Sequence, residues 1–181
     1  GYKTGEGTPE DLLTQFDLAE RAIEALGILV WPMIDYEADD ALATAALTCS
    51  RLPEVEQVVI CSADKDLAQM VKGDSVVCYD RRREKFMDEA GVVEKFGVFP
   101  SSIPDLLALT GDAADGIPGI PKWGAKTSSQ LLFHYGHIED IPSDPSAWGV
   151  KVRGAATAAE SLNSHTEEAR LYKDLTTLRT D

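Results

Sequence analysis

The chain has 181 residues, a hydrophobic content of 44% and a formal net charge of −14 at pH 7. That length can bury a sizeable core, and the hydrophobic content is ordinary for a globular protein. No apolar run is long enough to span a membrane and the first residues do not read as a signal peptide, so we expect a cytoplasmic protein without a membrane partner. The acidic balance argues against a broad nucleic-acid-binding surface, because such surfaces are usually basic.

Two features weaken that charge argument. Part of the acid is concentrated in a few clusters that bound cations would neutralise. Basic residues also gather locally, in Arg81–Lys85, at Lys122 with Lys126, and at Lys151 with Arg153. The arginine run is more often a solvated turn than a ligand site. Nucleic-acid binding is therefore expected to be sensitive to salt and confined to one site.

Cysteine and histidine carry little signal. Cys49, Cys61 and Cys78 show neither paired nor metal-ligand spacing, so we expect them to be reduced and buried. The three histidines also lack partners at metal-binding spacing, which favours structural roles for them.

The first half of the chain has the pattern of an α/β protein. Thr8–Asp11 is typical of a helix start, and apolar residues follow at helical spacing as far as Leu26. Ile28–Met33 and Gln57–Cys61 are short apolar runs that predict buried strands, the second of them covered on both faces. Ser75–Tyr79 predicts a further strand that continues into a hairpin.

The second half is predicted to be almost entirely helical. The periodicity and capping residues place helices from Asp88 to Phe96, from Ile103 to Thr110, from near Ala125, from Gly154 to Leu162, and from Thr166 to Leu178.

Residues 111–127 place two kinds of chemistry side by side. Asp112 and Asp115 are three residues apart and would share a face on a helical turn, where two carboxylates repel unless a cation or a proton lies between them. The glycines and prolines that follow break the helix. The helix start near Ala125, flanked by Lys122 and Lys126, offers free backbone N–H groups that suit phosphate. The segment predicts a metal-dependent enzyme that acts on a nucleic-acid backbone.

Seven carboxylates in three groups are the candidate metal ligands: Glu37, Asp39, Asp40, Asp64, Asp66, Asp112 and Asp115. Acids at a helix start also favour the helix dipole, and a single aspartate after a strand can merely cap a helix. Three acids in four positions repel, however, and carboxylates without histidine or cysteine suit Mg²⁺ or Mn²⁺. If the fold joins the groups, two ions about 4 Å apart could activate water and stabilise the leaving oxygen of a phosphodiester.

Five motifs resemble the 5′-nuclease family, which includes the 5′–3′ exonuclease domain of bacterial DNA polymerase I, the phage 5′-exonucleases and the flap endonucleases. The motifs are Tyr36-Glu37-Ala38-Asp39-Asp40 and residues 62–67, 93–98, 103–109 and 111–121. They follow one another in order, and the likeness covers nearly the whole chain. It implies the later part of a PIN-like parallel-sheet catalytic domain over residues 1–98. A helical DNA-binding subdomain with a helix–three-turn–helix is implied over residues 99–181.

The resemblance also implies an activity, its residues and its partners. The activity is two-metal hydrolysis of DNA at a 5′ end or a flap in replication and repair. Asp39, Asp64, Asp66 and Asp115 would be catalytic, and all seven acids would serve two Mg²⁺ or Mn²⁺ ions. The DNA-binding residues would be Lys3, Gly119, Lys122, Gly124, Lys126 and Thr127, with K⁺ held at the turn. The implied partners are DNA with 5′ ends, flaps or nicks and a DNA polymerase domain or polymerase partner.

Several positions depart from the family pattern. Gly116 stands where the family usually has Asn, while Lys122 and Trp123 replace a glycine and an aliphatic residue. Trp123 is expected either to pack on a sugar or to fill space. A basic residue expected soon after Lys3 is missing or displaced.

The family's first strand, which carries a metal-binding aspartate, would lie before Tyr2. We therefore expect the sequence to be the later part of a longer protein and a weak or inactive nuclease alone. Two alternatives stay open: an inactive or truncated DNA-binding relative, and a PIN-type ribonuclease.

Overall fold

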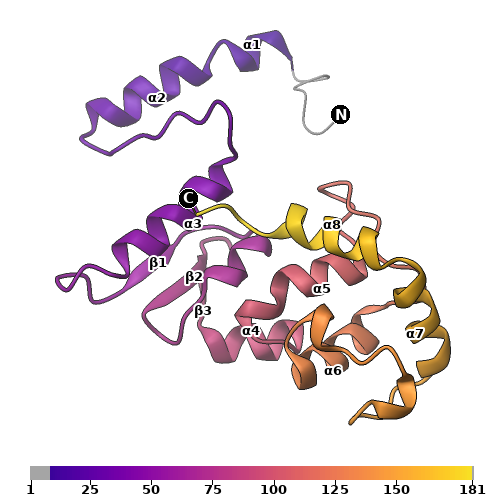
Figure 1. Ribbon diagram of the computed structural model, residues 1–181. Helices are drawn as coiled ribbons and strands as arrows, with labels where there is room; N and C mark the ends of the chain where they lie inside the picture. The colour runs from indigo at the N-terminus through magenta and orange to yellow at the C-terminus, as the bar shows by residue number, and fades with distance from the viewer. Residues whose placement is uncertain (1–8, 181) are drawn as a thin grey trace.

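A small sheet lies beside a group of helices in the computed structural model, which describes residues 9–180 (Figure 1). Strand β1 (Val58–Ile60) pairs in parallel with β2 (Val76–Asp80), and β2 pairs antiparallel with β3 (Lys85–Met87). The strands predicted at residues 57–61 and 75–79 and the hairpin after them are confirmed. β1 is not covered on both faces within the described residues, since Val59 is 41% exposed, whereas the β2 residues 76–78 are buried.

The segment before the sheet differs most from expectation. Two helices, α1 (Glu10–Leu13) and α2 (Phe16–Ala25), replace the single predicted helix, and Thr8 lies outside the described residues. Residues 28–33 form no strand, because no described segment offers them a backbone partner. The apolar side chains of α1 and α2 are exposed, and Figure 1 shows both helices standing away from the sheet and the other helices.

Three elements pack around the sheet. Helix α3 (Ala38–Cys49) contacts β1 and the 3₁₀ helix η1 (Asp66–Met70), and its buried Ala43 and Ala46 allow the close approach that the alanine-rich sequence predicts. Helix α4 (Glu89–Phe96) contacts β3 and begins as predicted at Asp88, whose Oδ1 accepts a 2.8 Å hydrogen bond from the Gly91 N–H.

The second half is helical, as predicted. Its elements are η2 (Pro100–Ser102), α5 (Ile103–Thr110), α6 (Ala125–Tyr135), η3 (Ile138–Asp140), η4 (Pro145–Ala147), α7 (Ala155–Ser164) and α8 (Thr166–Thr176). Helix α5 is buried from its first residue to Leu109, with α8 along one side and α6 along another. The α/β sheet followed by a helical subdomain confirms the predicted fold class.

A buried carboxylate joins three elements of this half. Asp105 of α5 is fully buried and accepts hydrogen bonds from the Ile138 N–H at 2.9 Å and from Lys173 Nζ of α8 at 2.8 Å, while His137 Nδ1 lies 2.9 Å from its other oxygen. Lys173 also pairs with Glu139 at 2.7 Å. Burial alone would lower the pKa of Lys173, but the two carboxylates outweigh it and raise that pKa.

Lys173→Met should lower the free energy of unfolding by about 3 kcal/mol, because it leaves a buried carboxylate with less compensation. Arg170→Met on the same helix is the matched control. Arg170 forms an exposed pair with Glu167 at 3.0 Å, so its loss should cost less than about 0.5 kcal/mol. Urea unfolding of both variants measures the difference, and equal losses would contradict the role given to Asp105.

Two glycines bring separate backbone segments into contact after α5. A Cβ on Gly119 would lie 2.5 Å from the Gly111 nitrogen and 2.7 Å from the Thr110 carbonyl carbon. A Cβ on Gly111 would meet the Ile117 carbonyl oxygen at 2.8 Å. Both glycines have positive φ, and the chain therefore folds back onto the end of α5 only where side chains are absent.

Gly119→Ala should destabilise the protein by at least about 3 kcal/mol, from strained φ plus a backbone clash. Gly116→Ala provides the control. Gly116 has nearly the same φ, +72° against +75°, but nothing lies within 4 Å of its Cβ position. The free energy of unfolding should therefore fall by only about 1 kcal/mol in Gly116→Ala. Thermal unfolding compares the two, and similar losses would rule out the close approach as the cause.

The prediction that the cysteines are reduced and buried is confirmed only in part. All three cysteines are free, and Cys78 is buried as expected, but the prediction is wrong for Cys61, which is exposed. None of the helices in the described part of the chain has the length and apolar character needed to cross a bilayer.

Candidate metal centre and nucleic-acid interface

Three predicted ligands come together in the described structure. Asp66, Asp112 and Asp115 each place a carboxylate oxygen within 4.8 Å of the other two. Asp66 opens η1 just after β1, and the other two lie in the turn after α5. That turn is not the helical turn that the spacing suggested. Backbone hydrogen bonds of 2.8 Å in both directions between Asp112 and Ile117 close it as a loop instead.

The electrostatics of the three carboxylates are unequal. Burial and the neighbouring charges of Asp64, Asp112 and Asp115 raise the pKa of Asp66 to about 7. Its Oδ1 is buried and accepts no hydrogen bond from the described residues. Burial would raise the pKa of Asp112 too, but hydrogen bonds from Lys65 and the Ala114 N–H outweigh it and lower that pKa.

The donor set fits a hard divalent cation. It consists of carboxylate oxygens that repel one another, and one of them is buried without a donor, which is the environment that Mg²⁺ or Mn²⁺ relieves. Part of the charge is already balanced, because Lys65 Nζ lies 2.6 Å from Asp112 Oδ2. The repulsion that remains is seen in the raised pKa of Asp66.

A cleft of about 990 Å³ brings the first acidic group to the same place. Its lining includes Glu37, Asp39 and Asp40 from the start of α3 together with Asp66 and Asp115. Residues 174–180, at and beyond the end of α8, also line this cleft, with Asp174 and Arg179 among them. The sequence predicts no role for these residues or for Lys65, although Lys65 lies in the motif of residues 62–67, because nothing local to the sequence shows which carboxylate a lysine will meet.

Asp40 and Asp64 also have structural hydrogen bonds. Asp40 Oδ2 accepts a bond from the Glu37 N–H at 3.2 Å and its Oδ1 accepts one from the Arg179 N–H at 2.8 Å, which ties the tail of α8 to the start of α3. Asp64 Oδ1 accepts a bond from the Asp66 N–H at 3.2 Å. Asp64 is exposed and lies outside the close cluster of three. The ligand roles of both residues stay predictions.

The predicted DNA-binding turn has a strained position. Gly124 precedes α6, so the first N–H groups of that helix follow Lys122. Lys122 has φ +72°, and Glu84 is the other described non-glycine residue with positive φ. A glycine would adopt this conformation without strain. Lys126 and Thr127 lie in the first turn of α6, and Lys3 is outside the described residues.

Trp123 fills space and does not present its ring to a ligand. It is 4% exposed, and its Nε1 donates a 3.0 Å hydrogen bond to the Ala158 carbonyl. This decides between the two roles expected for it. His137 and His165 are engaged in structural contacts with Asp105 and the Ser161 carbonyl, as expected.

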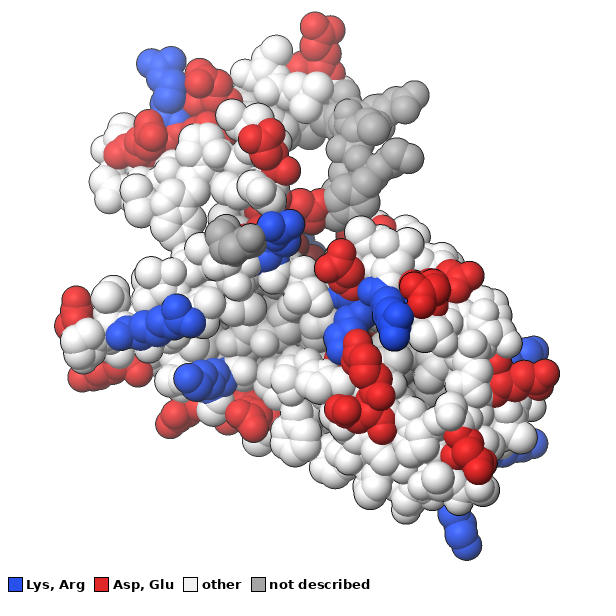
Figure 2. Space-filling view, viewed as in Figure 1, with Lys and Arg blue, Asp and Glu red and all other residues white. Residues whose placement is uncertain are grey.

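Charge of both signs is distributed over the surface. On the face shown in Figure 2, lysines and arginines are interspersed with acids and form no continuous basic surface. This face offers local phosphate contacts at most, and site-confined binding stays a prediction.

Comparison with known proteins identifies the family. Residues 1–97 match the model of the 5′–3′ exonuclease N-terminal resolvase-like domain, and residues 98–181 match that of the 5′–3′ exonuclease C-terminal SAM fold. The chain belongs to the 5′–3′ exonuclease family. It is 34% identical to DNA polymerase I of Mycobacterium leprae, covering all of this chain and 19% of that protein. It is 31% identical to a 5′–3′ exonuclease of Buchnera aphidicola, covering 99% of this chain and 62% of the relative.

Solved structures agree on the fold. The chain superposes on a T5 5′-exonuclease mutant with a TM-score of 0.75 at 19% identity, covering 93% of this chain and 66% of that one. It matches the T5 D15 flap endonuclease, solved as a pseudo-enzyme-product complex with DNA and metal ions, with a TM-score of 0.72 at 20% identity, covering 99% and 67%. The chain thus spans about a fifth of the polymerases and about two thirds of these nucleases.

The metal-free protein should lose stability as pH rises from about 4 to about 7. The pKa of Asp66 is raised from its ordinary value of 3.8 to about 7. In that interval the folded chain keeps a proton that the unfolded chain has released, so unfolding is favoured by rising pH. Asp66→Asn should remove this part of the pH dependence. Urea unfolding across the range in EDTA measures it, and identical pH profiles for both proteins would contradict the assignment.

Proposed function

We propose that this chain carries the catalytic acids and the DNA-holding turn of a metal-dependent 5′–3′ exonuclease or 5′-flap endonuclease. The observation that carries the proposal is the cluster of Asp66, Asp112 and Asp115, with a buried unpartnered oxygen on Asp66. Family membership supports it, as does the T5 flap endonuclease that was solved with DNA and metal ions. The reaction is hydrolysis of a DNA phosphodiester during replication and repair.

The seven candidate ligands divide into two groups around two ions. Asp66, Asp112 and Asp115, with Asp64, would hold one Mg²⁺ or Mn²⁺, and the first acidic group, Glu37, Asp39 and Asp40, would hold the other. Bound ions supply a water of lowered pKa and neutralise charge on the phosphodiester. Asp39, Asp64, Asp66 and Asp115 are the proposed catalytic residues.

The protein's own contribution is to fix these carboxylates. The loop closed by Asp112 and Ile117 sets two of them, and the start of η1 sets Asp66. Lys65 neutralises Asp112, so that the net charge left for a cation is smaller than the count of acids suggests. Pre-organised oxygens avoid the cost of rearrangement when the ion and the substrate bind.

The proposed DNA contacts lie on the helical side of the molecule. Gly119, Lys122, Gly124, Lys126 and Thr127 would hold the backbone of a duplex with a 5′ end, flap or nick, and backbone carbonyls of the turn would hold K⁺. The N–H groups at the start of α6 support a phosphate contact there. We propose the division into residues 1–98 and 99–181 as catalytic and DNA-binding parts. A DNA polymerase domain or partner is proposed from the relatives that are polymerases.

Cleavage of a 5′-labelled flap duplex tests the proposal, and we expect product with Mg²⁺ or Mn²⁺ and none with EDTA. Asp66→Asn should reduce the rate at least about 100-fold, because several kcal/mol of transition-state charge stabilisation depend on the ion. Asp74→Asn is the control, since Asp74 is exposed and outside the cleft. The assay should use both this chain and the longer protein that contains it.

Three outcomes would oppose the proposal. Metal-independent binding of flap DNA without cutting in either protein would indicate a non-catalytic DNA-binding relative. In such a relative Lys65, and not a metal ion, would neutralise the cluster at Asp112. Faster cutting of an RNA strand would indicate a ribonuclease. Equal loss of activity in Asp74→Asn would show that the effect of Asp66→Asn is not specific to the cluster.

Lys122→Gly should separate stability from DNA binding. The change removes a strained left-handed residue and should stabilise the protein by about 1 kcal/mol. It also removes a phosphate contact, so flap affinity should fall and the salt slope of binding should decrease by about one. Glu84→Gly relieves similar strain, at φ +52° in the hairpin, and should leave DNA binding unchanged. Unchanged DNA affinity in Lys122→Gly would exclude Lys122 from the interface.

A further inference from the structure

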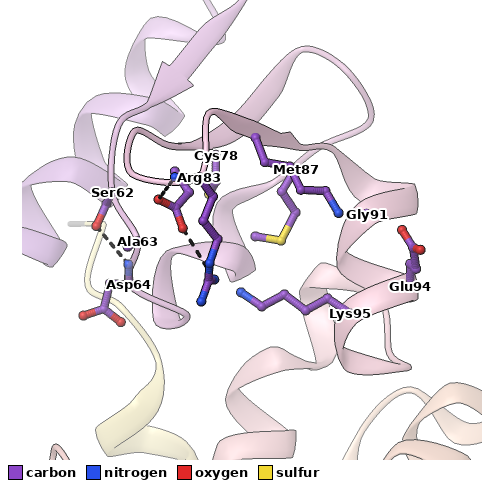
Figure 3. A pocket seen from close by; sticks show the side chains of 11 residues that line it. Ser62, Ala63, Asp64, Cys78, Arg83, Met87, Gly91, Glu94 and Lys95 are labelled. Atoms are coloured by element: carbon purple, nitrogen blue, oxygen red, sulfur yellow. Dashed lines mark hydrogen bonds and ion pairs between the residues drawn. The ribbon is translucent and has the colours of Figure 1, made fainter.

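A second pocket, of about 400 Å³, lies beside the acidic cleft, and Asp64 is the one proposed metal ligand among its lining residues. It is bounded by residues 62–64 after β1, by the β2–β3 hairpin and by α4 (Figure 3). Its volume is within the range of about 300 to 1,000 Å³ that is usual for small-molecule sites. Segment 62–66 separates it from the acidic cleft, because Asp64 lines the pocket and Asp66 lines the cleft.

Two cationic side chains from different elements converge in this pocket. Arg83 comes from the hairpin and Lys95 from α4, and Figure 3 shows their charged ends pointing toward the same space. Like charges that approach each other at a surface repel, and an anion between them would relieve the repulsion. Lys85 is a third cation in the lining.

The hairpin holds Arg83 in place. Asp80 Oδ1 accepts hydrogen bonds from the Arg82 N–H at 2.9 Å and the Arg83 N–H at 3.2 Å, and Asp80 Oδ2 lies 3.5 Å from the Arg83 guanidinium. The turn is therefore ordered by its own hydrogen bonds. This gives Arg83, one member of the arginine run that the sequence predicts as a solvated turn, a defined position in the lining of a pocket.

Two carboxylates of the lining, those of Asp64 and Glu94, do not lie between the two cations. In Figure 3 the carboxylate of Asp64 points away from Arg83 and Lys95, and Glu94 lies at the opposite rim. Asp80 is already engaged by the hairpin. An anion placed between Arg83 and Lys95 thus meets two cationic ends, one of which, Arg83, already has Asp80 as an ion-pair partner.

The rest of the pocket is apolar. Met87, Ala63 and Cys78 line it, and Gly91 leaves room beside Met87, because a Cβ there would lie 3.2 Å from Met87 Cγ. Burial raises the pKa of the Cys78 thiol to about 11, against the opposing effect of Lys95, so the sulfur is a neutral lining atom at physiological pH. The thioether of Met87 would make a favourable contact with the aromatic ring of a bound ligand.

We propose that this pocket binds one nucleotide of a DNA strand, with the phosphate between Arg83 and Lys95 and the base against Met87. The inference rests on the proposed function, since it places a nucleotide of the substrate strand next to the carboxylates that would hold the catalytic metal ions. The pocket would act as a subsite that holds the strand on the far side of segment 62–66 from the acidic cleft.

Binding in EDTA tests the pocket without cleavage. Amide NMR spectra of the chain are recorded with 2′-deoxythymidine 5′-monophosphate, with thymidine, with inorganic phosphate and with a short 5′-phosphorylated oligo(dT). The nucleotide should shift the Ala63, Met87 and Gly91 amides, and thymidine and phosphate should bind more weakly. The oligonucleotide should shift the same amides at lower concentration, as expected of a strand subsite.

Variants identify the residues responsible. Arg83→Gln and Lys95→Gln should each weaken nucleotide binding at least about fivefold, which is typical of a lost charged phosphate contact. Arg81→Gln is the matched control, because Arg81 is in the same hairpin but outside the lining, and it should change affinity less than about twofold. All three side chains are exposed, so the variants should fold normally.

Four results would overturn the inference: no shifts with any probe, equal binding of inorganic phosphate and nucleotide, equal loss in Arg81→Gln, or an oligonucleotide that fails to reach the pocket. Because the measurement needs no metal, it can fail while flap cleavage succeeds. It can also succeed while cleavage fails, so the two proposals are tested separately.

Discussion

The repulsion among the carboxylates of Asp66, Asp112 and Asp115 is the constraint on which the rest of the structure depends. Groups within 4.8 Å of one another, one of them with a buried oxygen that no described residue satisfies, raise the free energy of the folded chain. Lys65 neutralises one carboxylate. Burial and the neighbouring acidic charges raise the pKa of Asp66 to about 7, so a proton can neutralise that carboxylate. The fold must hold all three groups in place against this repulsion.

Backbone contacts and a buried ion cluster provide that support. Gly111 and Gly119 let the chain return against the end of α5, and the paired hydrogen bonds between Asp112 and Ile117 close the loop. Asp105 fixes α5 to α8, and the tail of α8 crosses back to Asp40 at the start of α3. The acidic cleft is thus enclosed by segments that the same helix, α5, aligns. A cation that binds there is stabilised by geometry that exists before it arrives.

Much of this architecture could be predicted from local sequence. The helices from Asp88 to Phe96 and from Ile103 to Thr110, the strands near residues 58 and 76, and the hairpin follow from periodicity and capping residues. The three acidic groups could also be recognised in the sequence, because several carboxylates close together at the ends of predicted elements indicate a metal site. Residues 28–33 were predicted as a strand on composition alone, yet a strand also needs a neighbour for its backbone groups, and no described segment supplies one.

What sequence could not reveal depends on contacts between distant segments. Lys65 and Arg179 are ordinary charged residues in the sequence, and only the fold places one against Asp112 and the other on the wall of the cleft. The same holds for Arg83 and Lys95, which are twelve positions apart and come together through a hairpin and a helix. Trp123 had two expected roles, and its burial beneath α7 chose between them.

Calorimetric titration of Mn²⁺ into the chain at neutral pH tests the central claim, that the acidic cleft is a divalent-metal site. The account predicts saturable binding with proton release, since the cation displaces the proton that Asp66 retains. It also predicts that Asp66→Asn removes at least one bound ion while Asp74→Asn removes none. No binding at millimolar Mn²⁺, or the same stoichiometry and affinity in Asp66→Asn, would contradict it.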